Sequence, residues 1–172
     1  DGLEATFRLW PHRLHGEGQF AAVLERDGGS TRETVHERLS PFPAAISEFF
    51  DRFALPLSGE TVSFGDTVRL APKELPELKG LHVLRVGLEL GEVRKGRFLP
   101  AHALALALSG CANSVSYPAN SREIAAYLRG ETLADPHTDW TLVCVDGYPL
   151  GWAKGSGGVL KNHYPKGLRR LT

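Results

Sequence analysis

The stretch DWTLVCVDGYPLGWAKG, residues 139–155, constrains the fold of this chain more than any other segment. Two strand-like runs flank Asp146–Gly147, a dipeptide that favours a two-residue hairpin turn because both residues tolerate positive φ. The next segment, GVLKNHY at 158–164, supplies one more short strand. The C-terminal part of the chain is therefore predicted to contain antiparallel β-structure.

A helix is predicted to follow Ser40, which can cap it, with Pro41 in its first turn. Four apolar residues recur at i, i+3, i+4 and i+7, namely Ile46, Phe49, Phe50 and Phe53. This spacing places them in a single stripe, which is typical of a helix that packs one face on a core.

The segments 100–109 and 120–131 are also predicted to be helices. The first alternates like a strand, but its alanine content and Pro100 at its first position favour a helix. In the second, Asn120 and Glu123 have the spacing of a capping box. Gly130 is predicted to end the second helix.

Short strands are predicted between and before the helices. ETVSF and TVRLA flank the turn dipeptide Gly65–Asp66, and HVLRVGLELGEV (82–93) is a longer strand, with a bulge at its glycines. At the N-terminus, ATFRLW (5–10) and QFAAVLER (19–26) are predicted to pair as a hairpin. Strands and helices do not alternate as in a βαβ array, so the predicted fold class is α+β with mainly antiparallel pairing.

Positive charge is concentrated at the C-terminus. The whole chain balances 20 Lys and Arg against 20 Asp and Glu, yet residues 147–172 contain five cations and no acid. Aromatic residues lie among these cations. Cations that neutralise phosphates, beside rings on which bases stack, are typical of a nucleic-acid surface, whereas an ordinary solvated edge needs no such mixture.

We therefore predict a nucleic-acid-binding surface in the C-terminal segment. Its candidate residues are Trp152, Lys154, Lys161, Asn162, His163, Tyr164, Lys166, Arg169 and Arg170. Trp152 alternates with Leu150, so a place in the core is the alternative for that ring. A second hypothesis for the whole segment is a basic face that docks an acidic protein.

Motifs for catalysis and cofactor binding are missing from these 172 residues. There is no phosphate-binding loop, no dinucleotide fingerprint and no nucleophile elbow, and Cys111 and Cys144 have neither metal nor redox spacing. His12, His15 and Glu17 are possible metal ligands of a small enzyme, a third hypothesis. Spacing on a loop is weak evidence, however, so we favour polar side chains that bond their own loop and expect no metal.

No run of apolar residues is long enough for a membrane helix, and no signal peptide opens the chain, so we expect a cytoplasmic protein without a membrane partner.

Three stretches carry a family resemblance. VDGYPLGWAKGSGGVLKNHYPKGLRR (145–170) resembles the C-terminal PUA-like module of bacterial ribosomal RNA cytosine-C5 methyltransferases of the Nop/Sun group, and LRVGLELGEVRKGRFLPAHALALAL (84–108) resembles the small domain before it. RLWPHRLHGEGQFAAVLER (8–26) resembles the last two strands of that family's catalytic domain.

The resemblance implies four parts. They are a terminal hairpin left from the catalytic domain at 1–27, a linker at 28–40, a small mixed α/β domain at 41–110, and a PUA-like antiparallel β-barrel that binds RNA at 111–172.

The resemblance also implies a division of labour. The family binds S-adenosylmethionine and uses a nucleophilic cysteine of a Pro-Cys motif in its catalytic domain, and no Pro-Cys occurs in this chain. No catalytic role is carried to Cys111 or Cys144. We expect this chain alone to bind no cofactor and to catalyse nothing. Its implied partners are ribosomal RNA or a ribosomal subunit and its own catalytic domain.

Overall fold

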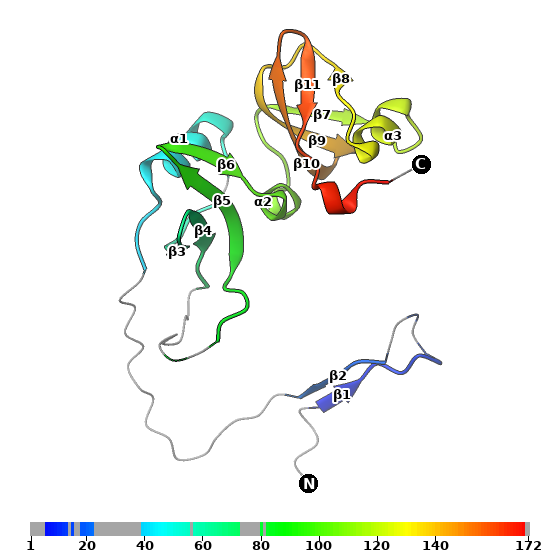
Figure 1. Cartoon of the computed structure of the whole chain (residues 1–172). Helices are drawn as coiled ribbons and strands as arrows, with labels where there is room; N and C mark the ends of the chain where they lie inside the picture. The colour runs from blue at the N-terminus through cyan, green and yellow to red at the C-terminus, as the bar shows by residue number, and fades with distance from the viewer. Residues whose placement is uncertain are drawn as a thin grey trace. The chain divides into compact units, whose positions relative to one another are not determined.

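The computed structural model divides the chain into two compact units, Asp1–Glu33 and Thr34–Thr172 (Figure 1). The residues that it describes are 6–13, 15, 18–22, 39–55, 57–72, 80 and 82–170. In the first unit, β1 (Thr6–Arg8) and β2 (Phe20–Ala22) pair antiparallel, which confirms the predicted hairpin. The predicted linker lies outside the described residues except for its last two.

A four-stranded antiparallel sheet opens the second unit, in the order β3-β4-β5-β6. Its strands are β3 (Thr61–Phe64), β4 (Thr67–Leu70), β5 (Leu88–Arg94) and β6 (Arg97–Pro100). The turn at Gly65–Asp66 and a bulge in β5 are as predicted: Val68 pairs with Gly91 and Arg69 with Glu89, so Leu90 is the extra residue.

The prediction that this third strand starts at residue 82 is wrong, because β5 starts at Leu88. Gly87 explains the difference. Its φ of 48° bends the chain, and a Cβ at this position would lie 1.9 Å from the carbonyl oxygen of Leu70. The backbone therefore turns tightly against β4 at Gly87 and becomes a strand only afterwards.

The predicted apolar stripe lies in α1 (Ala44–Phe53), and all four of its residues are buried. The predicted start of this helix is wrong. Pro43 holds the N-cap position, and Ser40 is instead bonded to β3, donating its N–H to the Thr61 oxygen at 2.9 Å and accepting the Thr61 N–H at 2.7 Å. Ser40 therefore forms an isolated antiparallel bridge with Thr61 and does not cap the helix, because its backbone groups are already paired there.

A five-stranded sheet follows, in the order β7-β9-β10-β11-β8. Its strands are β7 (Ser114–Tyr117), β8 (Leu133–Ala134), β9 (Asp139–Val145), β10 (Tyr148–Ser156) and β11 (Val159–Asn162). The predicted hairpin is confirmed, with Asp146 and Gly147 at φ of 49° and 86° between β9 and β10. β7 and β8 escaped prediction.

This sheet is curled like half of a barrel (Figure 1), and it departs from the predicted antiparallel barrel in two ways. β7 runs parallel to β9, so the sheet is mixed. β7 and β8 are its two ends and do not pair with each other, so the barrel is not closed. The fold class is nevertheless α+β, as predicted.

The two remaining helices are α2 (His102–Ala107) and α3 (Arg122–Arg129), and a short 3-10 helix, η1 (Lys166–Leu168), follows β11. Both helices were predicted, but their starts differ. Pro100 ends β6, so α2 starts after Ala101. Ser121 caps α3, its hydroxyl oxygen accepting the N–H of Ile124 at 3.2 Å, in place of Asn120. No helix in the described part is long and apolar enough to cross a membrane.

Each face of the five-stranded sheet is covered by other elements. On one face, Trp140 and Trp152 belong to a core that includes α1, β6 and α2, and the rings of Phe49 and Trp152 meet edge to face at 5.8 Å. On the other face, Tyr127 of α3 packs in a core with Val143. The two sheets of the second unit thus share one apolar core.

Candidate nucleic-acid interface

Lys154 and Lys161 lie directly opposite each other on β10 and β11, and both are exposed. Neither forms an ion pair with a described residue. Like charges at directly opposed positions of an antiparallel pair destabilise a sheet, because their Cβ atoms are only about 5 Å apart. The pair therefore concentrates uncompensated positive charge on this part of the sheet, although it lowers the stability of the fold. Uncompensated positive charge is what an anion-binding surface requires.

Lys166 and Arg170 extend the positive charge beyond the sheet. Both are exposed, and neither has a carboxylate partner among the described residues. The backbone N–H of Arg170 donates to the oxygen of Leu128 at 3.0 Å, which fixes this end of the chain on α3. We call Lys154, Lys161, Lys166 and Arg170 the four free cations.

Arg169 and Asn162 hold the fold together. The Nε and Nη2 atoms of Arg169 donate to the carbonyl oxygen of Tyr164 at 3.3 and 3.1 Å. The amide nitrogen of Asn162 donates to the oxygens of Tyr127 and Glu131 at 2.8 and 3.0 Å, and its oxygen accepts the Tyr164 N–H at 2.8 Å. Asn162 thus ties β11 to α3 and to Glu131 just beyond it, and Arg169 holds the C-terminal segment to Tyr164.

The prediction that Trp152 offers a stacking surface is wrong. Its side chain is 1% exposed, and its indole N–H donates to the oxygen of Ala101 at 3.0 Å. The alternation with Leu150 did indicate a core position. Tyr164 is half-buried, with its ring 5.3 Å from His102 and 5.4 Å from Tyr127, so it offers only part of its surface.

His163 is the ring of the predicted set that stays exposed. It packs edge to face on Trp140, with ring centroids 4.5 Å apart. Burial of one side of the imidazole, followed by the charge of Lys154, lowers the pKa of His163 below its ordinary value. The ring is therefore neutral at pH 7, so it can stack or donate a hydrogen bond but adds no charge.

A groove of about 220 Å³ lies beside these residues, and the sequence did not indicate it. Trp140 of β9 and Lys154 of β10 line it, together with Phe49 of α1 and with Arg97 and Phe98 of β6. The Lys154 ammonium lies 5.2 Å from the centre of the Trp140 ring, at cation–π distance. Only the register of β9, β10 and β11 brings Trp140, Lys154 and Lys161 into one row across three strands.

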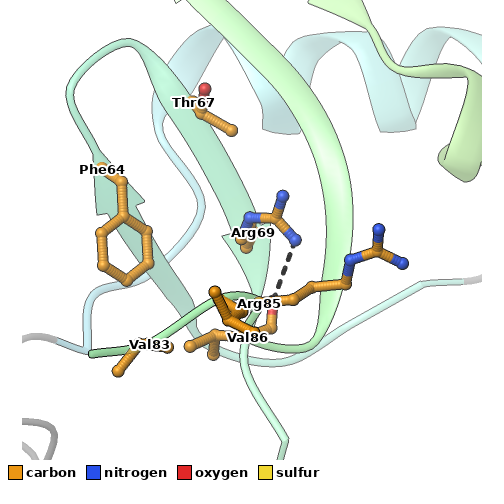
Figure 2. Close-up of a pocket in the computed structure, with 7 residues that line it drawn as sticks. Phe64, Thr67, Arg69, Val83, Arg85 and Val86 are labelled. Carbon is orange, nitrogen blue, oxygen red and sulfur yellow. Dashed lines mark hydrogen bonds between the residues drawn. The ribbon is translucent and has the colours of Figure 1, made fainter. Parts of the chain in front are cut away.

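A second hollow, of about 260 Å³, lies on the four-stranded sheet (Figure 2). Phe64 and Val83 form its apolar part, and Figure 2 shows the guanidinium of Arg85 extending away from them. Arg69 is already paired, donating from Nη1 to the oxygen of Val86 at 3.3 Å and bonding Glu89 through Nη2. The charge of Arg69 is compensated by Glu89, whereas that of Lys154 in the groove is not.

The cysteines are not activated as nucleophiles. Burial raises the pKa of the Cys111 thiol, and burial together with the proximity of Cys111 raises that of Cys144, so both are protonated thiols at pH 7. Among the described residues, no three His, Cys, Asp or Glu side chains gather as a metal site. His12 and His15 are exposed, but Glu17 lies outside the described residues, which leaves their suggested metal site untested.

Comparison with known proteins identifies both lobes of the second unit. Residues 48–108 match the first C-terminal domain of the RsmF ribosomal RNA methyltransferases, and residues 114–170 match the methyltransferase RsmF PUA domain. Together, the two matches cover both sheets of the second unit, with α2 and α3 and the second half of α1. These two matches place the second unit among the C-terminal regions of ribosomal RNA methyltransferases.

Curated relatives agree. The chain is 30% identical over 96% of its length to the ribosomal RNA small subunit methyltransferase F of Shewanella oneidensis, and 32% identical over 59% of its length to that of Erwinia tasmaniensis. It spans 38% of the Shewanella protein and 22% of the Erwinia protein in these matches. The chain belongs to the RsmF methyltransferase family and corresponds to its C-terminal region.

Proposed function

We propose that this chain is the RNA-binding C-terminal part of a bacterial, S-adenosylmethionine-dependent ribosomal RNA cytosine-C5 methyltransferase. The observation that carries the proposal is the directly opposed pair Lys154 and Lys161, which has no acidic partner among the described residues and lies within the match to the PUA domain. A β-module that presents cations without counter-ions suits the backbone and shape of folded RNA.

The domain boundaries follow from the same proposal. Residues 1–27 are the end of the catalytic domain, 28–40 a linker, 41–110 the small domain and 111–172 the RNA-binding module. The two family matches, 48–108 and 114–170, support the last two parts. In this arrangement the chain holds ribosomal RNA, or a ribosomal subunit, for its catalytic domain in the cytoplasm.

Salt dependence is the first test of the proposal. If about three of the four free cations contact phosphates, log K against log[salt] should have a slope near −2, at roughly −0.7 per contact with an unpaired strand. Fluorescence anisotropy with a structured fragment of small-subunit ribosomal RNA measures this slope. The control is an acidic protein whose net negative charge is similar to that of the RNA fragment. Tighter binding to that protein than to the RNA would favour the hypothesis of a docked protein partner.

A second prediction concerns the cofactor. Because neither cysteine is an activated nucleophile and no cofactor fingerprint occurs in the sequence, the isolated chain should neither bind S-adenosylmethionine at micromolar concentration nor transfer its methyl group. Isothermal titration calorimetry and a methyl-transfer assay check the two statements. Cofactor binding with micromolar affinity would contradict this assignment of the catalytic part.

A further inference from the structure

The groove described above brings together cations from both matched domains. Arg97 starts β6 and lies in the match to the first C-terminal domain, whereas Lys154 lies in β10 and in the match to the PUA domain. Phe49, Phe98 and Trp140, which belong to the shared apolar core, also line the groove. A ligand in this groove therefore touches both domains at once.

The charges around the groove favour an anion. Arg97 is exposed, is paired in register with Arg94, and forms no ion pair with a described residue. Arg94 differs, because Asp66 and Glu92 lie within 3.3 and 2.9 Å of its guanidinium.

The other charged residues that line the groove are a cation and two acids. Arg52 and Asp139 compensate each other at 2.9 Å, and Glu48 carries the remaining negative charge. Arg97 and Lys154 thus outnumber the one acid without a partner.

The shape of the groove favours a thin ligand. Its volume of about 220 Å³ is below the roughly 300–1,000 Å³ of typical small-molecule sites. Trp140 lines the groove but is only 5% exposed. The exposed ring nearby is the neutral His163, which packs on Trp140 and does not itself line the groove. Two exposed cations in the groove, with a neutral ring next to Lys154, suit a strand with charged phosphates and unstacked bases.

We propose that an unpaired stretch of RNA runs through this groove, with Arg97 and Lys154 contacting phosphates of the same strand. The inference rests on the proposed function and extends it, because it assigns part of the RNA surface to the small domain. A hollow of about 220 Å³ has room for part of one strand and not for a duplex. The contact of Arg97 should therefore depend on an unpaired strand in the RNA.

The test compares Arg97→Glu with Lys95→Glu. Lys95 lies in the turn just before β6, two residues from Arg97, is exposed and undergoes the same change of charge, but it does not line the groove. The probes are a labelled ribosomal RNA hairpin with a long unpaired loop and a duplex of equal length. One charge-assisted contact is worth roughly tenfold in affinity, so Arg97→Glu should weaken loop binding about tenfold, and Lys95→Glu less than threefold. Neither variant should change duplex binding by more than threefold.

A milder variant and a reference variant make the outcome decisive. Arg97→Gln should make the salt slope with the loop less steep by about 0.7, the value of one contact. If Arg97→Glu and Lys95→Glu weaken loop binding equally, the proposal that RNA runs through the groove is wrong. If Lys161→Glu still weakens RNA binding in the same assay, the proposed function stands. Absence of RNA binding by the unaltered chain would overturn both. Arg97 is exposed, so thermal melting should be unchanged.

Discussion

Trp152→Ala should lower the free energy of unfolding by about 3–5 kcal/mol, the range observed when a buried aromatic side chain is truncated in a core. Trp152 is 1% exposed and packs against Phe49 at 5.8 Å and Trp140 at 6.4 Å. Its removal leaves a cavity where the two sheets share their core and also leaves the Ala101 oxygen without its donor. Denaturant unfolding followed by circular dichroism measures the loss.

Tyr148→Ala is the matched control for this change. Tyr148 is also an aromatic residue of β10, but it is 74% exposed at the hairpin, so its truncation should change stability by less than about 0.5 kcal/mol. If Trp152→Ala instead left stability intact and reduced only RNA affinity, Trp152 would be a stacking surface and not a core residue.

The elements with strong local signals were predictable. The stripe of α1 is a property of spacing alone, and the Asp146–Gly147 turn depends on two residues that accept positive φ. Both signals act within a few residues of the chain, so a single sequence contains them. The fold class followed from the same local patterns.

The elements that depend on distant partners were not predictable. Ser40 has the chemistry of a helix cap, but its backbone bonds to Thr61 decide its conformation. β7 has few apolar residues and becomes a strand because β9 offers it a parallel edge. In each case the deciding hydrogen bonds cross more than twenty residues of sequence, where local propensity carries no information.

The candidate site shows the same limit. Charge and composition indicated the four free cations, because a lysine or arginine without an acidic partner is exposed by default. Composition could not separate them from Arg169, whose guanidinium is bonded to Tyr164, or reveal that Arg97 shares a groove with Lys154. Lys154 and Lys161 could be found as a pair only after the register of β10 and β11 was known.

Changing Lys161 and Lys166 together to glutamate should weaken RNA binding about 100-fold at low salt, since each charge-assisted contact to phosphate is worth roughly tenfold. Both side chains are exposed, so the variant should fold normally. Phosphate contacts carry no sequence information, so affinity should fall about equally for RNAs of different sequence. The salt slope should become less steep by about 1.4, the value of two contacts with an unpaired strand.

The matched control for this variant is Lys95→Glu combined with Arg122→Glu, which changes the net charge equally at exposed positions outside the C-terminal segment. Long-range repulsion alone would weaken binding to the same small extent in both double variants, because exposed charges farther apart than about 8–10 Å are largely screened at physiological salt. A loss specific to Lys161 and Lys166 therefore reports direct contact with RNA. Unchanged binding by the folded Lys161→Glu, Lys166→Glu protein would show that its basic segment is only a solvated edge, and the proposed function would fail with it.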